Sequence, residues 1–326
     1  MLSAVVQRLR NGVPKDQMLP PFDPRSAVLY ALLAFEVVLT FVVVRAMGFT
    51  FSPKLFHMVP APVVFAALIS GPLIRRLGHP QIGGLIETWA LLGVQSLAAI
   101  FLLIPLTSIS APMADATLSR ADALLGFHWL SLAAALRDHP GLVYALEAIY
   151  RSFEWQPPLV LLLLWARNQG QRAWTLMTAL AVSLLITIAI YPFAPADGAL
   201  VFNHVTQADY PGLTLRMGWE FSAAIHAIKG GATVIEPELM TGFVSFPSYH
   251  AAAAVMLAWA GWRTPLRWPM VLLNIAMAFS ALLVGAHYLV DIVGGVIVAA
   301  VAVTVSRRLV ADSASQRRDR AILSSS

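Results

Sequence analysis

Long apolar segments dominate the chain, and charged residues fall mainly in the intervals between them. A helix needs about 20 mainly apolar residues to cross a bilayer. The pattern therefore predicts about eight membrane-spanning helices, near residues 26–47, 55–74, 82–106, 141–166, 171–194, 247–262, 265–285 and 287–309. We expect an all-α fold, a polytopic membrane helical bundle, in which the short sixth span is tilted or lies toward one side of the membrane.

The composition agrees with this pattern and excludes several kinds of chemistry. Hydrophobic residues make up 58% of the chain and charged residues 12%, whereas a soluble domain is about 25% charged. The absence of cysteine excludes disulfides, thiolate nucleophiles and cysteine-ligated metal sites. The net charge of +5 does not indicate nucleic-acid binding, because no basic segment carries interleaved aromatic residues.

Lysine and arginine residues occupy alternate intervals between the spans, which predicts the orientation of the chain. Such residues gather in cytoplasmic segments. The residues concerned are Arg8, Arg10, Lys15, Arg25, Arg75, Arg76, Arg167, Arg172, Arg263, Arg267, Arg307, Arg308, Arg317, Arg318 and Arg320. We expect both termini to be cytoplasmic, the first span to be an uncleaved signal anchor, and the connections near 107–140 and 195–246 to be extracytoplasmic.

Two histidines stand out because ionisable groups at membrane depth are costly. His250 ends the run Ser245-Phe246-Pro247-Ser248-Tyr249-His250, in which Pro247 suits the first turn of a helix and Ser245 or Phe246 would cap it. Ser248 and His250 would then lie at the start of span six. The free backbone N–H groups and the positive helix dipole at such a start favour a phosphate.

His287 begins span eight, and Asp291 follows four residues later on the same helix face. The carboxylate can hold one imidazole nitrogen and leave the other free to attack or to exchange a proton. Spans six and eight both enter from the outside, so His250, His287 and Asp291 are expected at one membrane face. An interhelical hydrogen bond, a helix-stabilising pair or a metal site would use the same residue types, but the spacing of His226 and Glu220 does not indicate further metal ligands.

These residues resemble a known family. Phe246-Pro247-Ser248-Tyr249-His250 and Gly285-Ala286-His287-Tyr288-Leu289-Val290-Asp291 look like the second and third signature motifs of the type 2 phosphatidic acid phosphatase superfamily. The fuller run from Ser245 most resembles the inositol phosphorylceramide synthase-like branch, which contains phosphatases and head-group transferases. The resemblance implies a six-span catalytic core over 82–309, preceded by a cytoplasmic N-terminus with two accessory spans (1–81) and followed by a cytoplasmic tail (310–326).

The resemblance also implies a mechanism. His287 would be the nucleophile that takes the phosphoryl group, Asp291 would orient it, and His250 would protonate the leaving oxygen. Ser248 would bind a phosphate oxygen. Neither a metal nor a cofactor is required, and the substrate would be a lipid.

Two cationic features of the family are missing. The chain has no Lys-x6-Arg-Pro motif, and the usual Ser-Arg pair of the third motif reads Ser280-Ala281. A phosphoryl group in its transition state still needs cations. Lys229, Arg216 and Arg151 are the candidates on the outer side, and we predict that Lys229 and Arg151 bind phosphate. Glu147 or Glu154 would alternatively neutralise Arg151.

Three functions remain open after these observations. Transfer of the phosphoryl group to water makes the protein a lipid phosphatase, and transfer to a small alcohol makes it a phosphotransferase. The missing cations instead favour a non-catalytic scaffold or a lipid-binding relative. An intramembrane hydrolase would need a Gly-x-Ser-x-Gly turn, and Ser248 lies in none.

Overall fold

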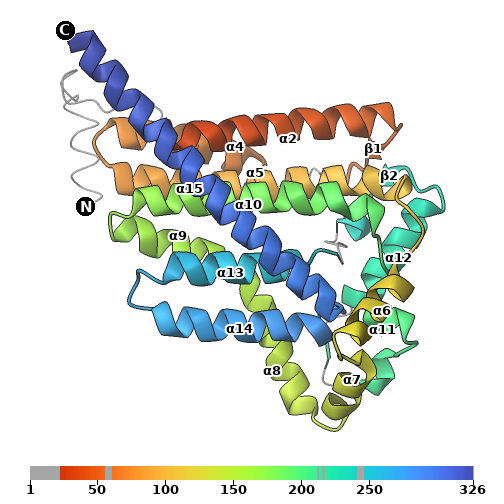
Figure 1. The fold of residues 1–326 in the computed structure, drawn as a ribbon. Helices are drawn as coiled ribbons and strands as arrows, with labels where there is room; N and C mark the ends of the chain where they lie inside the picture. Colours follow the sequence, from red (N-terminus) through yellow and green to blue (C-terminus); the bar gives the residue numbers. More distant parts are fainter. Residues whose placement is uncertain (1–22, 56–60, 211–212, 215–216, 241–245, 326) are drawn as a thin grey trace.

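The computed structural model describes residues 23–55, 61–210, 213–214, 217–240 and 246–325, and it shows an all-α bundle (Figure 1). The α-helices are α2 (Ala27–Ala46), α4 (Ala61–Arg76), α5 (Pro80–Ser108), α6 (Asp115–Leu124), α7 (Trp129–Arg137), α8 (Pro140–Arg151), α9 (Gln156–Ala166), α10 (Gly170–Ile190), α11 (Ala199–Phe202), α12 (Met217–Lys229), α13 (Tyr249–Gly261), α14 (Arg267–Leu283) and α15 (Leu289–Ser325). Short 3-10 helices are η2 (Pro24–Ser26), η3 (Ser152–Glu154), η4 (Tyr191–Phe193), η5 (Gln207–Asp209) and η6 (Pro237–Leu239). The strands β1 (Thr50–Phe51) and β2 (Val234–Ile235) pair in parallel.

Four helical segments are long and apolar enough to cross a membrane: Pro24–Ala46, Pro80–Ser108, Gly170–Phe193 and Leu289–Ser313. They coincide with the predicted spans one, three, five and eight, and they indicate a multi-pass membrane protein. The remaining predicted spans correspond to shorter helices, so eight spans stay a prediction. Span four is divided between α8 and α9 at η3, because Pro157 and Pro158 lack the N–H groups that would continue the helix.

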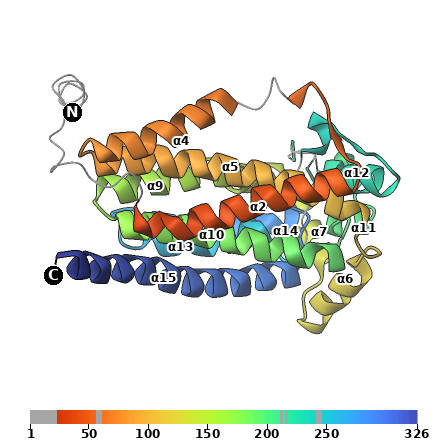
Figure 2. The same cartoon turned by 90° about the horizontal axis from the view of Figure 1, so that it is seen from above.

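Helix α10 forms the centre of the bundle and packs against α2, α5, α13 and α15. Its residues Trp174 and Met177 are fully buried. The facing part of α13 presents Ala252 and Ala253, also fully buried, and such small side chains let helices approach closely. Helices α2 and α4 lie along α5, with α4 on the side opposite α15, whereas α2 also contacts α15 (Figures 1 and 2).

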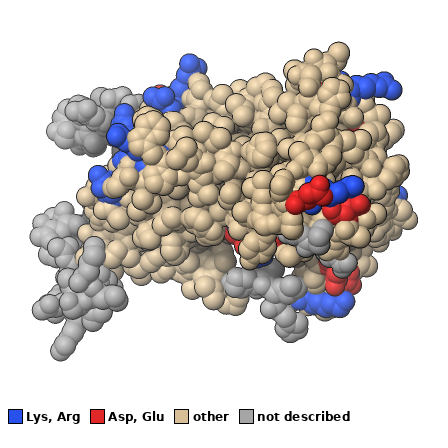
Figure 3. All heavy atoms as spheres, turned by 90° about the horizontal axis from the view of Figure 1, so that it is seen from below, with Lys and Arg blue, Asp and Glu red and all other residues tan. Residues whose placement is uncertain are grey.

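The two ends of the bundle differ. Helices α6, α7, α11 and α12 gather at the end where α13 and α15 begin, on the right of Figure 1. The connections α4–α5, α9–α10 and α13–α14 lie at the opposite end. Figure 3 shows Lys and Arg side chains at that opposite end, and both charge signs at the end with the short helices. This distribution agrees with the charge bias from which the orientation is predicted.

Gly295 provides a test of the packing between α13 and α15. A Cβ atom at this position would collide with the carbonyl oxygen of Ser248 and lie 2.9 Å from Cβ of Ala251. We expect Gly295→Ala to destabilise the protein by about 1–3 kcal/mol, because overpacking forces helices apart. Thermal unfolding in detergent measures this loss. Gly93→Ala is the matched control, because a Cβ there would meet only Val64 at 4.0 Å, and an unchanged melting temperature in both variants would contradict the expectation.

Candidate active site at two helix ends

Ser248 caps the N-terminus of α13. Its Oγ accepts a hydrogen bond from the backbone N–H of Ala251 at 3.3 Å, the contact typical of an N-cap residue. Its own N–H donates to the backbone carbonyl of Asp291 at 3.0 Å. The prediction that Ser245 or Phe246 caps this helix was therefore wrong, and Pro247 lies before the helix instead of in its first turn. Ser245 lies outside the described residues.

His287 lies between Ser248 and Asp291. Its Nδ1 is 3.2 Å from Oδ2 of Asp291, and its Nε2 is 3.2 Å from Oγ of Ser248. His287 is 4% exposed, and Ser248 and Asp291 are fully buried. Helix α15 begins at Leu289, two residues later than predicted, so His287 lies in the turn before the helix and does not share a helix face with Asp291. The turn before it uses a left-handed residue, Ala286, with φ of 54°.

His250 is held by aromatic residues of the divided fourth span. Its ring stacks on Tyr150, with ring centroids 4.3 Å apart and planes 21° apart. The hydroxyl of Tyr150 lies 3.3 Å from Nδ1 of His250. Phe153 contacts the same imidazole, with centroids 4.8 Å apart. Sequence reasoning missed both aromatics, although they flank Arg151 in the segment that was singled out for its charge.

Gly285 lets Tyr150 and His287 approach each other. A Cβ atom on Gly285 would lie 2.9 Å from Cδ2 of His287 and 3.0 Å from Cε2 of Tyr150. Tyr150 thus contacts the His250 ring while also lying near His287. The structure therefore brings His250, His287, Asp291 and Ser248 to one end of the bundle, from the starts of α13 and α15 (Figure 1).

The predicted phosphate-binding cations that the structure describes bind other groups. Lys229 donates to the carbonyl oxygens of Ser110 and Ala111 and to the Ser110 hydroxyl, each at 2.9 Å. Arg151 is half-exposed and lies 3.6 Å from Glu154. Arg216 lies outside the described residues. Their binding of phosphate stays a prediction, and in the described part of the chain no Lys or Arg hydrogen-bonds to Ser248, His250 or His287.

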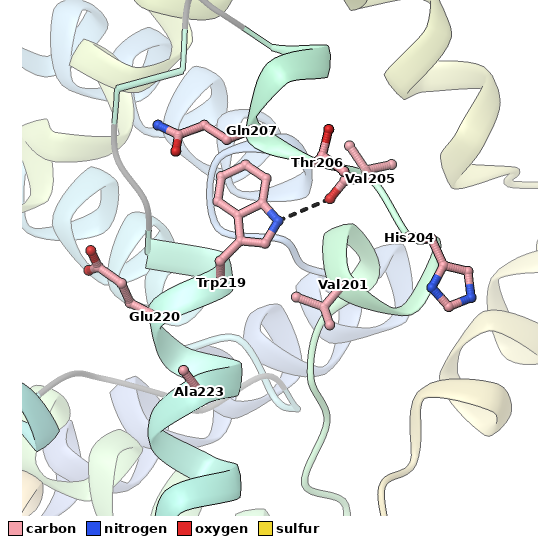
Figure 4. Close-up of a pocket in the computed structure, with 8 residues that line it drawn as sticks. All are labelled: Val201, His204, Val205, Thr206, Gln207, Trp219, Glu220 and Ala223. Atoms are coloured by element: carbon pink, nitrogen blue, oxygen red, sulfur yellow. Dashed lines mark hydrogen bonds between the residues drawn. The ribbon is translucent and has the colours of Figure 1, made fainter.

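A cavity of about 640 Å³ lies between α11 and α12, and none of its lining residues is one of the four site residues. Figure 4 shows Trp219 among its lining residues, with the indole N–H donating to the carbonyl oxygen of Val205 at 3.0 Å. The other lining residues are Val201, His204, Thr206, Gln207, Glu220 and Ala223. Both walls contact the turn before His287, because Ala199 donates to the carbonyl oxygen of Ala286 at 2.8 Å and Gly218 packs on Ala286.

The residues considered as further metal ligands are separate from the two histidines. Glu220 lines the cavity, and His226 pairs with Asp197 at 3.0 Å. Among the described residues, no cluster of three or more His, Cys, Asp or Glu side chains has a geometry suited to a metal ion.

The arrangement suits attack by an imidazole on an anionic group. Asp291 accepts from Nδ1 of His287, which leaves Nε2 with a lone pair directed toward Ser248. The first N–H groups of α13 have no partner within the helix, and together with the helix dipole they attract an anion. A phosphoryl group at this helix end would meet Nε2 of His287.

A comparison with protein families matches residues 116–305, more than half of the chain, to the PAP2 superfamily. No curated protein and no solved structure shows significant similarity to the chain. The matched residues run from α6 into α15 and include the two segments that carry His250 and His287.

Proposed function

We propose, because the chain belongs to the PAP2 superfamily, that it is a membrane lipid phosphatase or phosphotransferase that works through a phosphohistidine at His287. The observation that carries this proposal is the position of His287, between the Asp291 carboxylate at 3.2 Å and the Ser248 hydroxyl at 3.2 Å. A scaffold would not need a buried imidazole oriented by a carboxylate at a helix N-terminus.

The reaction proceeds in two displacements. Nε2 of His287 attacks phosphorus, the bond from phosphorus to the leaving oxygen breaks, and His250 donates a proton to that oxygen. Asp291 stabilises the cationic phosphorylated imidazole. His250 then takes a proton from the acceptor, whose oxygen attacks phosphorus and releases His287. Water as acceptor yields inorganic phosphate, and an alcohol yields a new phosphate ester.

Phosphate is held mainly by backbone donors in this proposal. Ser248 and the first N–H groups of α13 bind its oxygens. Arg151 and Lys229 remain the proposed cations. Arg151 follows Tyr150, which stacks on His250, and its half-exposed side chain would have to turn from Glu154 toward a phosphate at His250. To bind phosphate, Lys229 would have to give up its hydrogen bonds to the carbonyl oxygens of Ser110 and Ala111.

The proposal is tested with protein purified in detergent and supplied with phosphatidic acid, an isoprenyl pyrophosphate or a lysophospholipid. We expect phosphate release from at least one of these lipids, or a new lipid product when an alcohol acceptor is added. Neither product from any combination would favour the scaffold or lipid-binding alternative. That alternative rests on the absence, in the described residues, of a Lys or Arg hydrogen-bonded to the histidines.

We also propose that both termini are cytoplasmic and that the site is extracytoplasmic, as the charge bias indicates. The chain has no native cysteine, so single cysteines report topology cleanly. We expect an impermeant thiol reagent outside cells to label Ala208→Cys, at the exposed end near the site. Arg263→Cys, exposed in the α13–α14 connection at the other end, is the control that is labelled only after lysis. The reverse pattern would place the site in the cytoplasm.

A further inference from the structure

The start of α15 presents three successive backbone N–H groups, and each one meets a carboxylate. The N–H of Tyr288 donates to Oδ2 of Asp291 at 2.9 Å. The N–H groups of Leu289 and Val290 donate to the two carboxylate oxygens of Asp122, at 2.9 and 2.8 Å. Helix starts leave such donors without partners in the helix itself, so Asp122 satisfies two of them from outside.

Asp122 comes from a distant part of the chain. It lies on α6, 167 residues before Leu289, and its side chain is 2% exposed. Burial raises the pKa of the Asp122 carboxyl, whereas the N–H groups of Val290 and Leu289 act in the opposite direction. The cost of burying this carboxyl is thus partly offset by the helix start that it binds.

A second contact joins α6 to the same turn. The hydroxyl of Tyr288 donates to Oδ1 of Asp115 at 2.9 Å. Asp115 is anchored in turn by the N–H groups of Asp197 and Gly198, each at 3.0 Å. Tyr288 is 1% exposed, so the turn between His287 and Asp291 is held from both its backbone and its side chain.

Oδ2 of Asp291 serves two donors, the N–H of Tyr288 and Nδ1 of His287. If Asp122 were absent, the partly buried N–H groups of Leu289 and Val290 would lose this acceptor. Asp291 is the carboxylate of the same helical turn, and an anion there is attracted to those donors by hydrogen bonding and by the helix dipole. Asp291 would then be drawn away from the imidazole that it orients.

From these contacts we propose that Asp122 is a positioning residue for the phosphoryl-transfer reaction: by capping α15, it keeps the Asp291 carboxylate on Nδ1 of His287. The inference rests on the proposed function. In this proposal, α6, a short helix outside the bundle core, aligns the nucleophile His287, which lies just before α15.

The test is a double-mutant cycle on phosphate release. We expect Asp122→Ala to lower kcat about 10- to 100-fold with little change in KM, because a small misplacement of a reacting group has effects of this size. In an Asp291→Ala background, the same substitution should change kcat by no more than about 2-fold. Equal losses in the two backgrounds would overturn the proposal, because they would show that Asp122 does not act through Asp291.

Two further variants separate positioning from simple loss of structure. Asp122→Asn keeps one acceptor oxygen and should recover part of the lost kcat, while Asp138→Ala, an exposed substitution in the same outer connection, should be indistinguishable from wild type. Melting in detergent shows whether each variant folds. A well-folded Asp122→Ala protein with wild-type kcat would also overturn the proposal.

The outcomes distinguish this inference from the function on which it rests. If the His287→Ala variant had the activity of the wild-type protein, the proposed mechanism would be wrong, independently of the result for Asp122. Activity that depends on His287 but not on Asp122 would remove the inference alone.

Discussion

His287→Ala will lower phosphate release by about 10³-fold or more, with the fold retained. Removal of a nucleophile eliminates the covalent route and leaves only the binding and electrostatic contributions of the site. The substitution removes a buried side chain, 4% exposed, together with its hydrogen bonds to Ser248 and Asp291. We therefore expect a modest loss of stability beside the loss of turnover.

The covalent intermediate provides a second measurement of the same prediction. A substrate labelled in its phosphoryl group should transfer acid-labile label to the wild-type protein and none to His287→Ala. His139→Ala is the matched control, because His139 is exposed and makes no side-chain capping bond. Equal turnover or equal labelling in wild type and His287→Ala would remove the nucleophile assignment.

His250→Ala will have an effect that depends on the leaving group. With a lipid alkoxide as leaving group, loss of the proton donor should cost about 10²- to 10⁴-fold in kcat. An aryl phosphate such as 4-nitrophenyl phosphate releases a stable phenolate and needs little protonation, so the loss should be far smaller. The comparison requires the two substrates to be measured on one preparation of each protein.

The difference in kcat loss between the two substrates tests whether His250 is the general acid. His250 also stacks on Tyr150 and contacts Phe153, so its removal alters packing as well as chemistry. A packing defect would lower turnover of the two substrates by similar factors. Equal losses would therefore show that His250 supports the site without acting as the acid.

Some features of this site were predictable because they depend on local spacing. His287 and Asp291 are four residues apart, and this short separation favoured a contact between them, although α15 begins only at Leu289 and the contact joins the turn to the first helical residues. The alternation of connections that carry Lys and Arg predicted that His250 lies at the same end as His287. This prediction needs only the number and order of the spans. Ser248 was recognised as a helix-start residue, although the exact cap position was wrong because capping is decided by one side-chain rotamer and its N–H partner.

Other features could not be read from the sequence because they join distant segments. Tyr150 ends near His250, 100 residues away in the sequence, where the prolines at the start of α9 divide the fourth span from α8. The positions of Lys229 and Arg151 depend likewise on which oxygens lie within reach of long side chains. A charged residue in an apolar segment is easily recognised in a sequence, whereas the group that hydrogen-bonds to it or pairs with it is not.

The sequence by itself determined the membrane environment, the all-α fold class and the family resemblance, because hydropathy and short motifs are properties of neighbouring residues. Only the tertiary structure decided that Tyr150 stacks on His250 and that Asp122 caps α15. These contacts span about 100 to 167 residues, and they form because buried N–H groups and ring faces must find partners wherever packing brings them.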